Sequence, residues 1–409
     1  MNEDRLSALL RETPIPREAE AERRGLLMAS EVFAQRQTPR RQAFPRLALA
    51  VGISALLMGI LLSPAGAAVR DWVRNVFTTG VPDAERALTE VPGGGRLLVQ
   101  SQAGPWVVQP DGSRRLLGQY GDATWSPHGL FVAATAGSTL SALEPDGTPR
   151  WSISAASAIA DPRWSPSGVR IAYRTGRELR VVNADGTEDR AVDPDVAFAP
   201  PAWVPSGLHL LAYVDGKRRL RMVDTDSGEL AASALAIPGT LGLAWSPDGS
   251  LLLEWTERGL WLRAVSSDKL SQRIETGPPR RVPLPRNAAV RAAAFSPRDR
   301  TIAALLRLPA RPAGGPHSEV IAVDPDGGPR RRPFAVSGEL SDLTWSPDGS
   351  RLLVSWPDAD QWLFLSLRRA GRIQAVEGIA SVFSPGHSGR APFPKIDSWC
   401  CATHSSFAP

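Results

Sequence analysis

The sequence predicts an all-β protein made of repeated units, each of which forms one small antiparallel sheet. Three features indicate this. A tripeptide of an aromatic residue, serine or valine, and proline recurs seven times, short apolar runs follow its copies, and Asp-Gly turns alternate with it. The copies begin at Trp125, Trp164, Trp203, Trp245, Phe295, Trp345 and Phe383. Such a repeat is typical of a chain that builds its core by stacking similar units.

The spacing of the repeats indicates which architecture these units build. Successive motif aromatics are 39, 39, 42, 50, 50 and 38 residues apart, and one four-stranded propeller blade takes ~40 to 45 residues. The stretch 91–385 therefore divides into blades of ~42 residues if there are seven, whereas a ring of six needs ~49 residues each. We expect a seven-bladed β-propeller, with a six-bladed ring as the alternative.

The motif has a structural purpose in each blade. In "WSPDG", at 245–249 and 345–349, proline fixes the first corner of a turn, the Ser and Asp side chains bond back to the backbone, and glycine adopts a positive φ. The strand that follows, such as "RIAYRT" or "LLLEWT", is apolar on both faces, as expected between neighbouring blades. The motif tryptophan should fill the gap between blades, and its loss should cost about 3–5 kcal/mol.

The two ends of the repeat region predict how the ring closes. Residues 96–118 supply three strands and an Asp-Gly turn but no leading aromatic strand, while "GIASVFSP" at 378–385 supplies such a strand alone. We expect this last strand to complete the first blade, because closure removes exposed sheet edges. The propeller would then cover 91–385, and residues 386–409 would form a C-terminal tail.

A single transmembrane helix is predicted at 46–69. Residues 47–69 are a run of 23 without a charged side chain, which as a helix is ~35 Å long against ~30 Å of bilayer hydrocarbon. More arginines precede the run than follow it, which predicts an N-terminus in the cytoplasm and a propeller outside it. They are Arg36, Arg40, Arg41 and Arg46 before the run, and Arg70 and Arg74 after it. The alternative is a cleaved signal peptide that ends in the Ala-Gly-Ala at 65–67.

Shorter segments flank this run on both sides. Residues 1–45 predict two short helices separated by Pro14 and Pro16. We expect them to form a cytoplasmic helical segment, which either docks on a partner or is a solvated tail. Residues 70–90 are expected to form a juxtamembrane linker, which ends where the Pro-Gly-Gly-Gly at 92–95 breaks the chain.

The Trp-Ser-Pro-Asp-Gly units resemble the WD-like repeats of TolB-type β-propellers over about 91–385. The whole layout is similar to that of membrane-anchored proteins of high-G+C bacteria. The resemblance implies the propeller fold. It does not imply one activity, because propellers host binding scaffolds, lyases, dehydrogenases and hydrolase gatekeepers alike. Two units depart from the pattern, since Val204 follows Trp203 and "SPRDR" follows Phe295.

The sequence contains no signature of a catalytic, cofactor or metal site. No G-x-S-x-G elbow occurs, and a quinoprotein-like turn before Trp151 occurs only once. The 44 arginines and three lysines are scattered, so they form no stripe for nucleic acid. The histidines lack metal-site spacing; they are His128, His209, His317, His387 and His404. We therefore expect no enzyme activity, catalytic residue, cofactor, metal or nucleic-acid partner.

Both cysteines, Cys400 and Cys401, are adjacent near the C-terminus. Outside the cytoplasm they could form a vicinal disulfide, pair between two chains, or make a redox or metal contact with His404. A disulfide between neighbours closes almost no loop, so a large entropic contribution to folding is excluded. We expect an oxidised tail without a function of its own.

The expected function is that of a membrane-anchored extracytoplasmic β-propeller that acts as a non-enzymatic binding scaffold. Its partner would be a protein or an envelope polymer, held by the channel mouth and by the long loops at 266–289 and 306–319. The membrane contact would be made by residues 47–69. The alternative is a transmembrane signalling or anti-sigma-like regulator, in which residues 1–45 hold a cytoplasmic regulator and the propeller is the sensor. A third alternative is an envelope enzyme that uses the propeller mouth.

Overall fold

The computed structural model describes residues 88–205, 209–267, 274–309, 317–367, 372–384 and 391–401. The segments expected at 1–45 and 46–69, and all of the linker except its last residues, lie outside this part of the chain. Among the described residues, none of the helices has the length and apolar character that a membrane crossing needs.

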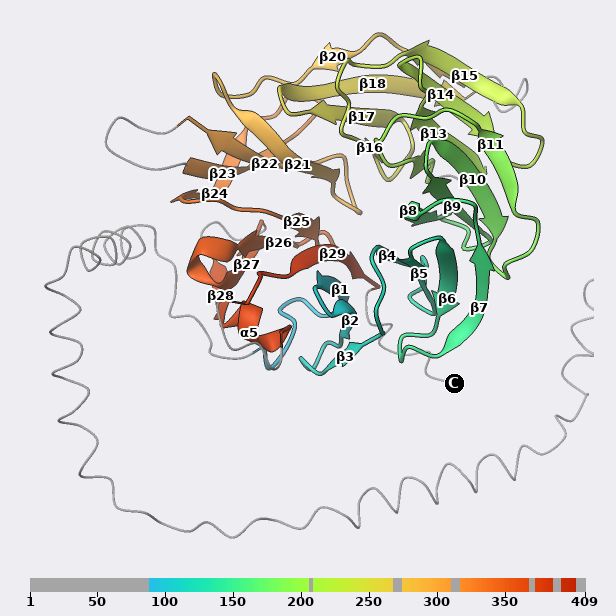
Figure 1. Cartoon of the computed structure of the whole chain (residues 1–409). Coiled ribbons are helices and arrows are strands. Elements are labelled where there is room, and N and C mark those ends of the chain that lie inside the picture. The colour runs from blue at the N-terminus through green and yellow to red at the C-terminus, as the bar shows by residue number, and fades with distance from the viewer. Residues whose placement is uncertain are drawn as a thin grey trace, which may run out of the picture. The chain divides into compact units, whose positions relative to one another are not determined.

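The described chain forms seven antiparallel sheets arranged as the blades of a ring (Figure 1). From the centre outward, blade 1 contains β29 (Lys395–Cys400), β1 (Arg96–Ser101), β2 (Gly104–Val108) and β3 (Arg114–Leu116). Blade 2 contains β4 (Ala123–Trp125), β5 (Val132–Ala136), β6 (Thr139–Leu143) and β7 (Pro149–Ser154). Blade 3 contains β8 (Ile159–Trp164), β9 (Arg170–Thr175), β10 (Glu178–Asn183) and β11 (Arg190–Asp193).

The remaining blades follow in chain order. Blade 4 contains β12 (Ala202–Trp203), β13 (Leu210–Val214), β14 (Arg219–Asp224) and β15 (Leu230–Leu235). Blade 5 contains β16 (Gly242–Trp245), β17 (Leu251–Thr256) and β18 (Gly259–Ser267), with β19 (Ile274–Thr276) and β20 (Arg280–Arg281) both paired to β18. Blade 6 contains β21 (Ala289–Phe295), β22 (Ile302–Leu308), β23 (His317–Val323) and β24 (Arg331–Ser337). Blade 7 contains β25 (Leu343–Trp345), β26 (Arg351–Trp356), β27 (Gln361–Ser366) and β28 (Ile373–Glu377).

The prediction of an all-β, seven-bladed propeller is therefore confirmed. The core lies between blades, as the sequence predicts, because the second strand of each blade is buried on both faces. In β26, for example, all residues after Arg351 are buried, and β13 is buried throughout. Blade 7 also contains a short helical turn, η1 (Pro357–Ala359), between β26 and β27, and helix α5 (Ile379–Val382) follows β28.

The turn chemistry expected for the motif is present. The hydroxyl of Ser246 accepts a hydrogen bond from the backbone of Leu251 at 2.9 Å and donates to Asp248 at 2.6 Å. Gly249 has a φ of 70°, in the region that favours glycine. Motif tryptophans reach across to the preceding blade, since the indole nitrogen of Trp203 donates to the carbonyl of Arg163 at 2.9 Å. The motifs of Trp203, Trp245 and Trp345 therefore close a turn within one blade and hydrogen-bond to the preceding blade.

The strand that closes the ring differs from the prediction. β29 pairs antiparallel with β1 and brings Trp399 opposite Leu97, so residues 395–400 belong to blade 1 and not to a C-terminal tail. The segment predicted to close the ring, 378–385, instead contains helix α5. Trp399 holds the place of a motif aromatic, and its indole nitrogen donates to the carbonyl of Gly94 at 2.8 Å.

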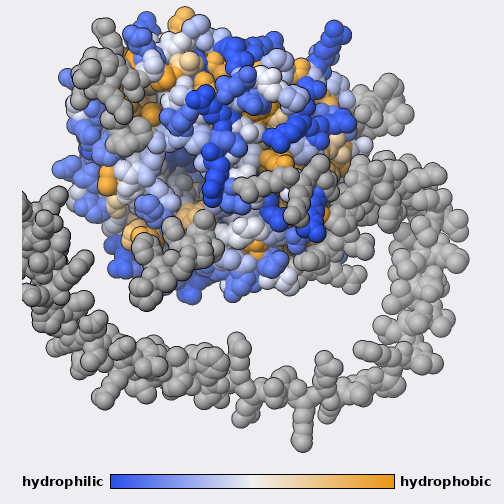
Figure 2. Space-filling view, turned by 180° about the vertical axis from the view of Figure 1, so that it is seen from behind, coloured by the Kyte–Doolittle hydropathy of each residue, from blue (hydrophilic) through white to orange (hydrophobic). Residues whose placement is uncertain are grey.

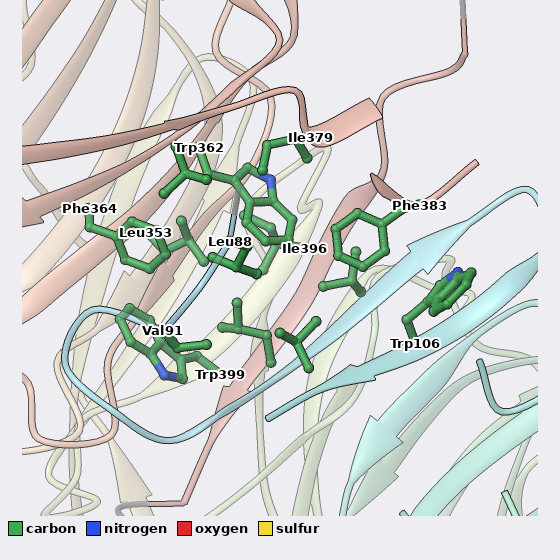
Figure 3. Close-up of a cluster of buried hydrophobic side chains, with 14 residues drawn as sticks. Leu88, Val91, Trp106, Leu353, Trp362, Phe364, Ile379, Phe383, Ile396 and Trp399 are labelled. Carbon is green, nitrogen blue, oxygen red and sulfur yellow. The ribbon is translucent and has the colours of Figure 1, made fainter. Parts of the chain in front are cut away.

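Local capping and packing explain why 378–385 is not a strand. Gly378 has a φ of 77°, and the Asp360 carboxylate accepts a hydrogen bond from the backbone of Ala380 at 2.7 Å, which satisfies a free N–H in the first turn of α5. Phe383 then lies between Trp106 and Trp362, with ring centroids 5.8 Å and 5.3 Å away (Figure 3). The Phe383 side chain is fully buried by this packing. This copy of the motif therefore supplies a core residue and does not form an innermost strand.

Candidate functional site

The seven innermost strands form a closed ring around the axis along which a β-propeller has its central channel. β29, β4, β8, β12, β16, β21 and β25 each contact the innermost strands of both neighbouring blades (Figure 1). Because adjacent strands run antiparallel, the connections between blades and the turns between second and third strands share one face. We call this the connection face. The motif turns and the turns between third and fourth strands share the other, which we call the motif face.

Aspartates mark the connection end of the innermost strands on one side of the ring. Asp122, Asp161 and Asp342 each precede a motif aromatic by three residues, and Asp397 precedes Trp399 by two. They belong to blades 2, 3, 7 and 1, which are consecutive around the ring. We call these four residues the acidic arc. The matching positions of blades 4, 5 and 6 carry no charge and form the neutral arc; they are Pro200, Gly242 and Ala292.

The closed ring brings the charges of Asp122 and Asp342 within electrostatic reach of Asp397. Burial raises the pKa of Asp397 to about 6, the negative charges of Asp122 and Asp342 add to the rise, and Arg163 and Lys395 oppose it. Burial also raises the pKa of Asp342, whose carboxylate accepts a hydrogen bond from Ser341 at 2.7 Å. Carboxylates that are partly withdrawn from water and near like charges are suited to receiving a positively charged group.

Blade 3 presents its aspartate through an irregular strand. The pairing of β8 with β9 shifts register between Ala160 and Arg163, and Asp161, within this bulge, has a positive φ of 55°. Its backbone N–H donates to the Asp122 carboxylate at 3.2 Å, and its own carboxylate pairs with Arg174 at 2.8 Å. Bulges and strained residues re-aim side chains at sites of recognition. The bulge thus couples blades 2 and 3 at the channel mouth.

Exposed apolar side chains lie on the connection face beside the neutral arc. Phe198 is 68% exposed and Leu241 is 48% exposed, in the connections that lead into blades 4 and 5, and Leu235 at the end of β15 is 76% exposed. The Arg174 guanidinium lies 4.8 Å from the Phe198 ring, so the acidic and apolar sides meet there. Figure 2 shows one face of the molecule, on which apolar residues form small groups among hydrophilic ones. Recognition here would combine charge with a few apolar contacts.

The candidate site was missed at the sequence level, where no site residue was predicted. The histidines do not contribute to it: His209 pairs with Asp226 at 2.9 Å, His317 lies 3.6 Å from Glu319, and His128 is in a motif turn. His387 and His404 lie outside the described residues. Within the described part of the chain, no three His, Cys, Asp or Glu side chains are placed to hold a metal ion.

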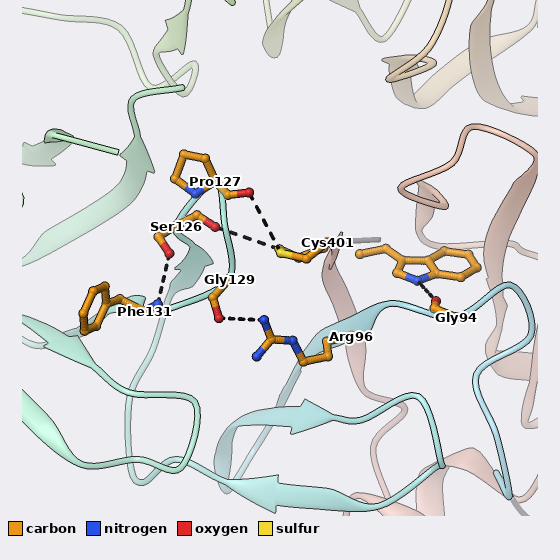
Figure 4. Close-up of a disulfide and its surroundings, with 9 residues drawn as sticks. Gly94, Arg96, Ser126, Pro127, Gly129, Phe131 and Cys401 are labelled. Atoms are coloured by element: carbon orange, nitrogen blue, oxygen red, sulfur yellow. Dashed lines mark hydrogen bonds between the residues drawn. A yellow bond between two sulfur atoms is a disulfide. The ribbon is translucent and has the colours of Figure 1, made fainter. Parts of the chain in front are cut away.

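The two cysteines lie on the motif face and not in a tail. Cys400 ends β29, and Trp399, Cys400 and Cys401 take the place of the aromatic-Ser-Pro of the other blades. The structure joins the cysteines as a vicinal disulfide (Figure 4). Their sulfur atoms lie 3.9 Å from the carbonyls of Ser126 and Pro127 in the motif turn of blade 2. The pair therefore lies at the seam where blade 1 meets blade 2.

Comparison with known proteins shows the fold. No protein-family model matches the chain, and no curated protein matches it significantly. The Cps50 (Swd1) β-propeller domain of Myceliophteria thermophila is similar with a TM-score of 0.51 and 16% identity, over 72% of this chain and 98% of that one. Hydrazine synthase of Kuenenia stuttgartiensis gives a TM-score of 0.44 and 14% identity, over 60% of this chain and 76% of that one. The chain has a seven-bladed β-propeller fold, and likeness at this identity carries nothing about activity.

Proposed function

We propose that the protein is a TolB-type, membrane-anchored propeller that acts as a non-enzymatic binding scaffold on the outer side of the cytoplasmic membrane. The uncharged run at 47–69 and the excess of arginines before it support a single-pass anchor with the N-terminus inside. The motif repeats support the TolB-type assignment. The rigid ring supports the scaffold role, since it holds loops of several blades in one fixed geometry.

The partner in this proposal is a protein segment that presents a basic residue next to an apolar one. The observation that carries the proposal is the two-sided channel mouth, where the acidic arc faces the neutral arc and its exposed neighbours Phe198 and Leu241. A lysine or arginine of the partner would enter beside Asp342 and Asp397. An apolar side chain next to it would cover Phe198, as anchors at interfaces commonly combine the two.

Neutralising part of the acidic arc tests this function. The variant carries Asp122→Asn and Asp342→Asn, which keep hydrogen-bond acceptors in place while they remove two charges. Its matched control carries Glu188→Gln and Glu275→Gln, two exposed carboxylates outside the channel mouth. Both full-length proteins are expressed in the native cell, crosslinked in intact membranes and purified, and the partners are quantified by mass spectrometry.

We expect the Asp variant to lose about 90% of its extracytoplasmic partner and the Glu control to retain it, because removing one member of a buried charge pair costs about 2 kcal/mol or more. Equal recovery from both proteins would contradict the proposal. Partners crosslinked only to residues 1–45, with none on the propeller, would favour the signalling alternative. A chain recovered in the soluble fraction after cleavage near residue 67 would remove the anchor from the proposal.

A further inference from the structure

A cavity of about 720 Å³ lies on the connection face at the junction of blades 5 and 6. One wall is the turn between β17 and β18, and the other is the connection from β20 to β21. Its lining residues are Glu257, Arg258 and the continuous stretch 281–289. This connection belongs to the long loop at 266–289 that the sequence singles out as larger than the scaffold needs. The cavity has the size of a small-molecule site.

The cavity is lined by positive charge that the described part of the chain does not neutralise. Arg258, Arg281 and Arg286 are all exposed, and none of them makes an ion pair with a described residue. The one carboxylate of the lining, Glu257, is already opposite Arg291, at 3.8 Å. Three arginines therefore line one hollow, and none of them has an acidic partner among the described residues. Guanidinium groups offer planar pairs of donors that match carboxylate and phosphate oxygens.

The walls are held in place before any ligand arrives. The Arg281 guanidinium stacks over the Trp261 ring at 5.7 Å, and its Nη2 donates to the carbonyl of Arg258 at 3.1 Å. The backbone N–H of Val282 donates to Leu260 at 2.9 Å, and that of Val290 donates to Glu257 at 2.8 Å. These bonds fix both ends of the connection. A site that is ordered in advance loses less freedom when a ligand binds.

The connection from β20 to β21 also limits the movement of Arg286. Pro283 and Pro285 fix the backbone on either side of Leu284, and Ala288 donates to the carbonyl of Pro285 at 3.3 Å. The turn thus formed carries Arg286. Leu284 and the two prolines give the cavity an apolar side, against which the carbon skeleton of a ligand can pack.

We propose that this cavity binds a small polyvalent anion, a molecule with two or more carboxylate or phosphate groups. The inference is independent of the partner proposed for the acidic arc, because the charge required here is the opposite one. Two or three arginines would share the anionic groups through paired hydrogen bonds. Such a ligand would contact both the turn between β17 and β18 in blade 5 and the connection from β20 to β21, which leads into blade 6.

The test is isothermal titration calorimetry, which measures the affinity of the detergent-solubilised full-length protein for citrate and, separately, for inorganic tripolyphosphate. The variants are Arg258→Gln and Arg286→Gln, and the matched control is Arg330→Gln. Arg330 is also exposed and lies in a turn of blade 6 on the motif face. Because all three side chains are exposed, each variant should keep the circular dichroism spectrum and melting temperature of the parent protein.

We expect saturable binding of at least one probe to the parent protein, and a loss of about tenfold in affinity for each cavity variant. Arg330→Gln should bind like the parent. Citrate alone would identify a carboxylate ligand, tripolyphosphate alone a phosphate ligand, and both results support the site. Absence of binding for both probes would overturn the proposal, as would an equal loss in Arg330→Gln, which would show only non-specific attraction.

Discussion

Replacing Trp399 with alanine tests how the ring is closed. Trp399 is only 7% exposed, packs edge-on against Phe364 at 5.6 Å, and donates its indole N–H to the carbonyl of Gly94 at 2.8 Å. Removing such a ring costs about 3–5 kcal/mol, and the lost hydrogen bond adds about 1 kcal/mol. We expect a loss of about 4–6 kcal/mol, which is a large part of the ~5–15 kcal/mol that stabilises a typical domain.

The assay is urea unfolding of the full-length protein in detergent, followed by circular dichroism of the sheet signal. Trp261→Ala is the matched control, because Trp261 is a half-buried tryptophan of β18 whose ring carries the Arg281 guanidinium on its surface. We expect about 1 kcal/mol or less for this control. If Trp399→Ala lost less than about 1 kcal/mol, or no more than the control, β29 would not be the strand that holds the ring closed.

Three further outcomes follow from the structure. A chain that ends before Lys395 lacks β29, so we expect the open edge of β1 to cause aggregation in size-exclusion chromatography, whereas a monomer with cooperative unfolding would contradict the closure. Burial raises the pKa of Asp397 to about 6. The charged carboxylate therefore destabilises the folded protein above pH ~6, and the effect disappears below pH ~4, where Asp397 is protonated in both the folded and the unfolded state. Asp397→Asn should then raise the free energy of unfolding by about 3 kcal/mol at pH 7.5 and leave it unchanged at pH 4; urea unfolding at both values checks this, and equal effects at both would refute it. The buried Ser346 hydroxyl accepts from Arg351 at 2.9 Å and donates to Asp348 at 2.6 Å, so Ser346→Ala should cost about 1–3 kcal/mol in the same assay, and no cost would show that the motif turn forms without it.

The blade number and the motif turns could be predicted because they depend on local sequence. A Trp-Ser-Pro-Asp-Gly turn contains its own acceptors and its own positive-φ glycine, as Ser246 and Gly249 show. The closing strand could not be predicted in this way. Phe383 carries the motif and Trp399 carries Cys-Cys in place of Ser-Pro, yet pairing with β1 selects the second. That choice depends on contacts across about three hundred residues of chain, between Trp399 and Gly94.

The wrong assignment of the closing strand also prevented a prediction of the candidate site. Asp397 belongs to β29, so a sequence interpretation that treats 386–409 as a tail cannot place it in the channel. Asp122, Asp161 and Asp342 can be aligned from their distance to the motif aromatics. The effect of the Asp122 and Asp342 charges on the pKa of Asp397 appears only when blades 7, 1 and 2 meet around one centre. The arginine cavity was indicated in part, because the loop at 266–289 is longer than the blade requires.

We propose that the channel mouth on the connection face is the surface that binds the partner. Site-specific photocrosslinking in living cells tests it most directly, with a benzophenone side chain placed at Phe198 or Leu241 on this face. The controls are Leu130 and Val169, which are 63% and 46% exposed in motif turns on the opposite face. We expect one partner to be crosslinked from Phe198 and Leu241 and not from Leu130 or Val169. Crosslinks of equal yield from both faces, or only from the motif turns, would contradict the claim.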